Sequence, residues 1–189
     1  MQLDVTSPAT VERWRPLVLW LLCIPLFVVA WVYSIIAGLL AFLGWFAALF
    51  TARLPESFAD LIAAYLRFSW RVQAYLLALT TRYPSFGLPG GRADPGDDPA
   101  SFVVGPPTPL SRLKVFFRFI LVIPHLVVLW FLGIAQEAVM LVAWFAVLIL
   151  GRWPDGMRSF VVGVFRWQWR VNAWFMLLTD EYPPFALEP

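Results

Sequence analysis

The sequence predicts an all-α integral membrane protein made of two tandem repeats, each a transmembrane helical hairpin followed by an amphipathic interfacial helix. Three observations predict this fold class. Residues 2–88 recur as residues 101–187, apolar residues are concentrated in two long blocks, and the basic residues all lie outside those blocks. Because a duplicated chain builds one unit twice, each element expected in the first repeat can be checked against the second.

The duplication has a constant offset of 99 positions and no gap, so that Pro25 returns as Pro124 and Trp70 as Trp169. The residues that recur are distinctive; they include Pro8, Pro25, Trp31, Trp45, Arg53, Pro55, Arg67, Trp70, Arg71, Tyr83, Pro84 and Phe86. We divide the chain into a first repeat at residues 1–88, a linker rich in Gly, Pro and Asp at 89–100, and a second repeat at 101–189.

Composition places the chain among membrane proteins. Of its 189 residues, 61% are hydrophobic and 14% are charged, with a mean hydropathy of +0.75. A soluble domain is about half apolar and about a quarter charged. A net charge of +2 gives no indication of a nucleic-acid partner. The single cysteine, Cys23, excludes an intramolecular disulfide, and residues 16–35 are expected to be an uncleaved anchor.

The two apolar blocks are predicted to fold as hairpins. Residues 16–52 contain no charge, and residues 119–151 contain one charged residue, Glu137. A straight helix over the first block would be about 55 Å long, whereas the hydrocarbon core is about 30 Å thick. We therefore expect turns at Ser34–Gly38 and Gly133–Glu137. The alternative is that the hairpins enter the bilayer without crossing it.

The basic residues that flank the blocks predict orientation. They are Arg13, Arg15, Arg53, Arg112, Lys114, Arg118 and Arg152, and neither expected hairpin tip carries Lys or Arg. By the positive-inside bias, both termini and the linker are expected on the cytoplasmic side of a multi-pass protein. Because each repeat then starts and ends on the same side, we expect a pseudo-two-fold axis along the membrane normal.

After each block, Arg-x-Pro and an acidic residue predict a helix start, and helices are expected over 56–80 and 155–179. Each carries two arginines four residues apart among aromatic side chains, a pattern typical of helices in the membrane interface. The candidate lipid- or partner-binding residues are Arg67, Arg71, Arg166, Arg170, Trp70 and Trp169. The alternatives are simple anchoring, or ion pairs with Asp60, Asp180 or Glu181.

Two short segments, Gln2–Val5 and Ser101–Val104, occupy equivalent positions before a recurring proline. They are expected to be extended and to pair with each other or with partner chains. The acidic linker stretch around Asp94 lacks the ligand spacing of a calcium loop and is expected to be solvated.

No pattern in the sequence predicts a catalytic residue, a cofactor site or a metal site. His125 is the only histidine and has no cysteine nearby, so we expect a neutral side chain packed in the protein. Glu137 is expected to be solvated at a hairpin tip.

The segments IPHLVVLWFLGIA, VAWFAVLILGRWPDG and FRWQWRVNAWFMLLTDEYPPF, with fainter counterparts in the first repeat, resemble the bacterial membrane family called domain of unknown function 4389. The resemblance implies a duplicated protein of the bacterial cytoplasmic (inner) membrane and supplies no catalytic residues. In the first repeat, Thr81 and Arg82 replace the Asp180 and Glu181 of the D-E-Y-P-P-F motif.

The leading functional hypothesis is a non-enzymatic membrane scaffold or accessory subunit that organises lipids or a larger complex. Its partners would be membrane lipids, including anionic ones, and a protein partner or a second copy of the chain. The alternatives are a membrane-shaping hairpin protein and a small-solute transporter or channel. A transporter path would need paired polar residues inside the blocks, and none recur there.

Overall fold

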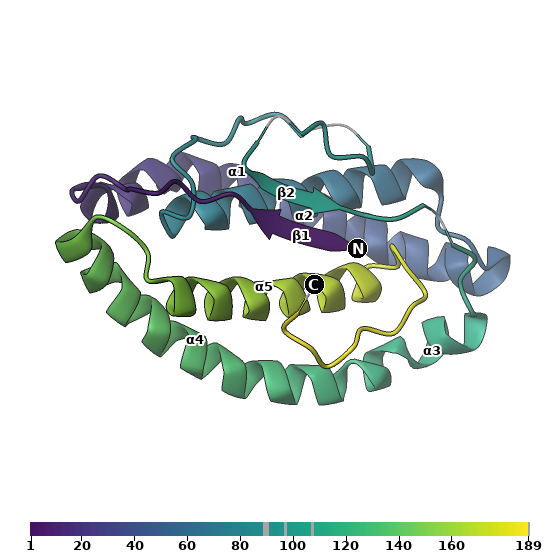
Figure 1. The fold of residues 1–189 in the computed structure, drawn as a ribbon. Coiled ribbons are helices and arrows are strands. Elements are labelled where there is room, and N and C mark those ends of the chain that lie inside the picture. Colours follow the sequence, from purple (N-terminus) through teal and green to yellow (C-terminus); the bar gives the residue numbers. More distant parts are fainter. Residues whose placement is uncertain (89–90, 97, 107, 189) are drawn as a thin grey trace.

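The computed structural model describes residues 1–88, 91–96, 98–106 and 108–188 (Figure 1). Within these residues, two strands and five helices follow one another, and the second repeat has the order of the first with α3 and α4 in place of α1. The elements are β1 (Gln2–Val5), α1 (Arg15–Thr51), α2 (Glu56–Leu76), β2 (Ala100–Val103), α3 (Arg112–Leu121), α4 (Ile123–Leu150) and α5 (Asp155–Phe175).

The apolar blocks form two long helices. α1 has 37 residues, and α3 continues into α4 through Val122, which has helical dihedrals, to give 39 residues from Arg112 to Leu150. Both are long and apolar enough to cross a membrane. Ser34–Gly38 and Gly133–Glu137 lie inside these helices, so the predicted hairpins within each block are wrong. An isolated glycine costs a helix only about 1 kcal/mol, and membrane thickness limits only a helix that crosses it.

A sharp turn follows each long helix. Ala52 and its equivalent Gly151 both adopt a left-handed conformation, with φ of 57° and 67°. The chain then reverses, so that α2 lies along α1 and α5 along α4. The returning segments reach the start of each long helix, where Tyr83 donates to the carbonyl of Leu22 and Tyr182 to that of Leu121, equivalent contacts in the two repeats.

α2 and α5 begin as predicted and end four residues early, but their surroundings differ from the prediction. Most residues of α2 are buried, because α1 covers one side of the helix and β2 another. α5 lies in the same way between α4 and β1. Their arginine faces are turned toward the strands, so the prediction that these arginines face the membrane surface is wrong.

The strands pair with each other as an antiparallel ribbon, which confirms one of the two predicted pairings. Leu3 lies opposite Phe102, and Gln2 lies opposite Val103. Leu3 and Phe102 are also equivalent positions of the two repeats, so a pseudo-two-fold axis passes between them. The repeats exchange strands across this axis, because β2 packs on α2 and β1 packs on α5.

The same axis relates the long helices. The indole of Trp45 donates to the carbonyl of Val115 at 2.9 Å, and the indole of Trp144 donates to the carbonyl of Pro16 at 3.2 Å. These are equivalent contacts, and they join each end of α1 to the opposite end of α3–α4. The long helices therefore run antiparallel, and the axis lies perpendicular to them (Figure 1). The ribbon rests on α2 and α5, which rest in turn on the long helices.

Candidate functional site at the strand ribbon

Two buried arginines of α2 hold the second repeat's strand. Arg67, which is fully buried, donates from Nε to the carbonyl of Phe102 at 3.1 Å. Its two terminal nitrogens donate to the carbonyls of Gly91 and Arg92, at 3.2 and 2.9 Å. Arg71, one turn later, donates to the carbonyl of Ala100. The side chains predicted to meet lipid headgroups thus bind the chain's own backbone.

Asp94 completes this cluster as the shared counter-ion. Its Oδ1 lies 3.0 Å from Arg71 Nη2 and its Oδ2 lies 3.4 Å from Arg67 Nε. The two oxygens also accept from the backbone N–H groups of Gly96 and Phe102, at 3.0 and 2.8 Å. Ion pairs of this kind are stable only when further hydrogen bonds satisfy the carboxylate, as they do here. The prediction of a solvated linker is therefore wrong for Asp94, whose side chain is 4% exposed.

The equivalent arginines of α5 lie in a more open setting. Arg166 donates from Nε to the carbonyl of Leu3 at 3.0 Å, the counterpart of the bond between Arg67 and Phe102, and its Nη2 lies 3.2 Å from Asp4. Arg170 donates to the carbonyl of Ala186. Its buried Nε has no partner among the described residues. Burial, and then the charge of Arg166, lower the pKa of Arg170.

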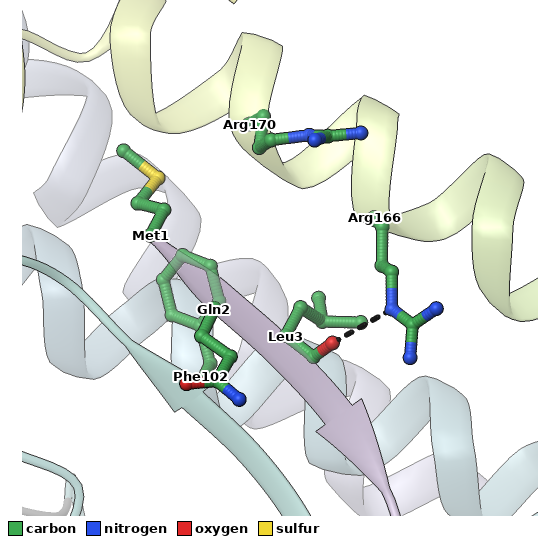
Figure 2. A pocket seen from close by; sticks show the side chains of 6 residues that line it. All are labelled: Met1, Gln2, Leu3, Phe102, Arg166 and Arg170. Atoms are coloured by element: carbon green, nitrogen blue, oxygen red, sulfur yellow. Dashed lines mark hydrogen bonds between the residues drawn. The ribbon is translucent and has the colours of Figure 1, made fainter. Parts of the chain in front are cut away.

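A cavity of about 210 Å³ adjoins these two arginines, and Figure 2 shows them on α5 beside β1. It is lined by Met1, Gln2, Leu3, Phe102, Arg166 and Arg170. A second cavity of about 250 Å³ shares Met1 and Arg170 with the first and extends along Tyr182, Pro183 and Pro184. We refer to the two cavities together as the groove; Arg166 and Arg170 are its cationic side chains, and Gln2, Thr179 and the carboxylate of Glu181 also line it.

The two candidate tryptophans belong to the core. Trp70 is fully buried, donates to the carbonyl of Asp4 at 3.2 Å and packs against Phe165. Trp169 packs against Phe102, and its indole nitrogen has no partner in the described part of the chain. Both rings lie against the ribbon, at equivalent places about the pseudo-two-fold axis.

The predictions for three further polar residues differ in how they compare with the structure. His125 is buried as expected; it accepts from the indole of Trp167 at 3.2 Å and stacks on Phe185. Glu137 is exposed at the middle of α4, so its predicted place at a hairpin tip is wrong. Asp180, proposed as a partner of the candidate arginines, instead pairs with Lys114 at 3.0 Å.

The comparison with known families agrees with the internal symmetry. A family model described as Domain of unknown function (DUF4389) matches residues 14–87 and again residues 112–186. The chain belongs to this family. It carries two DUF4389 copies in tandem, and each copy spans one long helix and the helix that returns along it. No curated protein and no solved structure matches the chain.

The two DUF4389 copies bring several arginine side chains together at the ribbon. Arg67 and Arg71 of the first copy share the buried carboxylate of Asp94. In the second copy, Arg166 pairs with the exposed carboxylate of Asp4, and Arg158 donates to the carbonyl of Val5. Within the described ranges, no group of three or more His, Cys, Asp or Glu side chains could hold a metal ion. Sequence patterns identified the arginines but missed Asp94. The available signal was the Asp-Pro-Gly turn, in which aspartate commonly accepts from the backbone two residues on.

Proposed function

We propose that the protein is a non-enzymatic scaffold or accessory subunit of the bacterial cytoplasmic membrane that lies within one leaflet. In this arrangement α1 and α3–α4 are embedded among the acyl chains, and the ribbon and linker face the cytoplasm. The ribbon and linker then form a docking surface for a partner, and the long helices hold that surface at the membrane. The observation that carries this proposal is the position of the charged ribbon, at mid-length of the helices and on the side away from the long ones.

The long helices offer apolar surface in nearly every outward direction. Only 11% and 22% of their most apolar windows are buried. Large exposed side chains occur along their full length, among them Leu17, Trp31, Phe42, Phe50, Phe116, Trp130, Phe145 and Leu150. A contiguous apolar surface of this extent favours contact with lipid.

The charges of the ribbon favour an in-plane arrangement over a crossing one. Arg67 and Arg71 lie near the middle of α2, and the linker with Asp94 covers that region. If the helices crossed the membrane, the linker and its acidic residues would lie at the depth of the hydrocarbon centre. A charged residue there costs at least about 2.5 kcal/mol, and irregular backbone facing lipid is not tolerated.

The basic flanks support the same arrangement. Val11 bonds to Gly151, which brings Arg13, Arg15 and Arg152 to one end of the helix pair. Leu110 bonds to Ala52, which brings Arg53, Arg112 and Lys114 to the other end. Crossing helices would put these groups on opposite sides of the membrane, against the positive-inside bias. In-plane helices leave both groups, both termini and the linker on the cytoplasmic side.

This proposal retains the expected axis along the membrane normal and replaces the expected multi-pass topology. The axis is perpendicular to the long helices, so an axis along the normal requires the helices to lie in the plane. The proposed lipid partners include anionic lipids, attracted by basic residues at both ends of the molecule at about 1 kcal/mol for each residue near the surface.

Depth measurements along α1 test the proposal. In a Cys23→Ser background, nitroxide labels at Leu17, Leu39 and Phe50 sample exposed positions at the start, middle and end of the helix. We expect similar depths in reconstituted bilayers, with a matched label at the exposed linker residue Ala93 fully accessible to water. A deep label at Leu39 between two shallow ends, together with a lipid-shielded label at Ala93, would contradict the proposal.

A second candidate function is membrane shaping, and the apolar layer formed by two long helices favours it. Inserting these helices into one leaflet adds area to that leaflet and bends the bilayer. Electron microscopy of vesicles at rising protein-to-lipid ratio tests this function. Tubules or smaller vesicles are expected if the protein shapes membranes. Unchanged vesicles would rule out membrane shaping and leave the scaffold as the only one of these two functions.

A further inference from the structure

We propose that the groove beside Arg166 and Arg170 binds an extended acidic peptide segment of a partner chain. A carboxylate of that segment would sit between the two arginines as Asp94 sits between Arg67 and Arg71. This inference deepens the scaffold proposal by naming the chemistry of its partner, and rests on that proposal only for the role of the complex.

The internal symmetry supplies the template. Arg67, Arg71 and Phe102 are equivalent to Arg166, Arg170 and Leu3, respectively. In both repeats the first arginine of the pair donates from Nε to the equivalent strand carbonyl of the other repeat, at 3.1 and 3.0 Å. The two sites thus share the arginine pair and its hydrogen bond to the strand, and they differ in the groups that lie beside the arginines.

In the first repeat, the linker fills the space beside the arginines with a carboxylate and two peptide carbonyls. In the second, the cavity of about 210 Å³ adjoins Arg166 and Arg170. Asp4 contacts Arg166 but does not reproduce Asp94, because its side chain is 58% exposed and its equivalent in the other repeat is Val103. The buried Nε of Arg170 has no partner in the described part of the chain.

The strand contributes a further donor. Phe102 donates its N–H to Asp94 and accepts from Arg67, so both of its backbone groups point away from β1. Directly opposed residues of an antiparallel pair share this orientation, which means that the N–H of Leu3 points away from β2. A carboxylate in the cavity can therefore accept from Leu3 and Arg166, the equivalents of Phe102 and Arg67. Arg71 reaches Asp94 through Nη2. The equivalent Nη2 of Arg170 donates to the carbonyl of Ala186, so Arg170 offers its Nε, which is unpartnered within the described residues, or exchanges that bond for the carboxylate.

The shape of the groove favours a peptide over a lipid headgroup. The guanidinium of Arg67 also binds the carbonyls of Gly91 and Arg92, so the template recognises backbone as well as charge. The second cavity also contains Arg170, and Tyr182, Pro183 and Pro184 give it apolar surface for the side chains of an extended chain. Glu181 lines the same cavity, so the carboxylate of the peptide belongs in the first cavity, beside Arg166 and Arg170.

The experiment uses the full-length protein in detergent and a fluorescent peptide with the sequence of residues 88–99, which contains Asp94. Fluorescence anisotropy should show saturable binding. We expect the same peptide with Asp94→Asn to bind about tenfold more weakly, because one charge-assisted interaction is lost. The Arg170→Gln protein should lose a similar factor, whereas Arg152→Gln, which changes an exposed arginine outside the groove, should bind normally.

A grafted variant controls for misfolding of the arginine mutant. Residues 88–99 are fused directly before Met1, which places them where the offset of 99 predicts the equivalent of the linker. The graft leaves both arginines intact, and it should block the free peptide and raise the thermal midpoint by about 3 °C. The same graft carrying Asp94→Asn should do neither.

Three outcomes would overturn the inference. One is the absence of saturable binding by the peptide; another is binding that is indifferent to both Asp94→Asn and Arg170→Gln. The third is Arg170-dependent binding of vesicles containing 30% anionic lipid without peptide binding, which would assign the groove to a headgroup. Because the peptide is tested in detergent, failure here is distinguishable from failure of the in-plane membrane arrangement.

Discussion

The two arginine sites of the molecule share a framework and differ in their counter-ions. On α2, Arg67 and Arg71 are buried around Asp94, and every oxygen of that carboxylate accepts hydrogen bonds. On α5, Arg166 and Arg170 are half-buried beside a groove, and Asp4 offers only an exposed carboxylate. The difference teaches that one duplicated motif can form a buried ion-pair cluster in one copy and leave a cavity beside the same arginines in the other.

The largest expected effect comes from the counter-ion of the closed site. Asp94→Asn leaves two buried arginines without their shared charge, and we expect it to lower the free energy of unfolding by about 3–5 kcal/mol. Asp4→Asn, at the exposed pair beside Arg166, should cost less than about 1 kcal/mol. Denaturant titration in detergent measures both. Equal losses would remove the distinction between a closed and an open site.

The arginines themselves should show the same asymmetry. Arg71→Gln removes a cation from a buried pair and is expected to lower the free energy of unfolding by about 3 kcal/mol. Arg170→Gln at the equivalent position should cost less than about 1 kcal/mol, because no carboxylate loses its partner. The same titration tests this comparison, and a larger loss for Arg170→Gln would mean that the second site is also a structural clamp.

The long helices should behave symmetrically where the arginine sites do not. Trp45→Phe and Trp144→Phe each remove one reciprocal hydrogen bond between α1 and α3–α4. Each change is expected to lower the free energy of unfolding by about 1 kcal/mol. Thermal unfolding of the two variants measures both losses. A loss of stability in only one variant would mean that the two hydrogen bonds do not contribute equally, although the axis relates them geometrically.

The smallest expected effect concerns solute passage. The polar residues of the apolar blocks do not recur between repeats, and His125 is packed against Trp167 and Phe185. We expect no increase in ion or small-solute flux across liposomes. A flux that is abolished by changing His125 or Glu137 would favour the transporter function instead.

Much of the architecture could be predicted because the sequence signals for it are recurring residues and short motifs. The duplication, the starts of α2 and α5, and the pairing of Gln2–Val5 with the second strand follow from recurring residues. The hairpin tips were misplaced because the prediction compared the length of a straight helix over each block with the thickness of the bilayer, although no proline interrupts the helix at Ser34–Gly38 or Gly133–Glu137.

The candidate site was only partly predictable for a different reason. The spacing of Arg67 and Arg71 places both on one face of a helix, but periodicity gives no information about what that face meets. Strand exchange decides this, because it brings the second repeat's strand and Asp94 to the first repeat's helix. Contacts between segments so far apart along the chain leave no local pattern, and the same aromatic-rich face therefore resembled a membrane-surface helix.

The orientation of the long helices tests the central claim most directly. Polarised infrared spectroscopy of the protein in aligned bilayers, with α1 and α3–α4 isotopically labelled by segment, reports the angle between these helices and the membrane normal. The in-plane arrangement predicts axes close to perpendicular to the normal for both. Axes tilted by less than about 40° from the normal, the range of membrane-crossing helices, would contradict it.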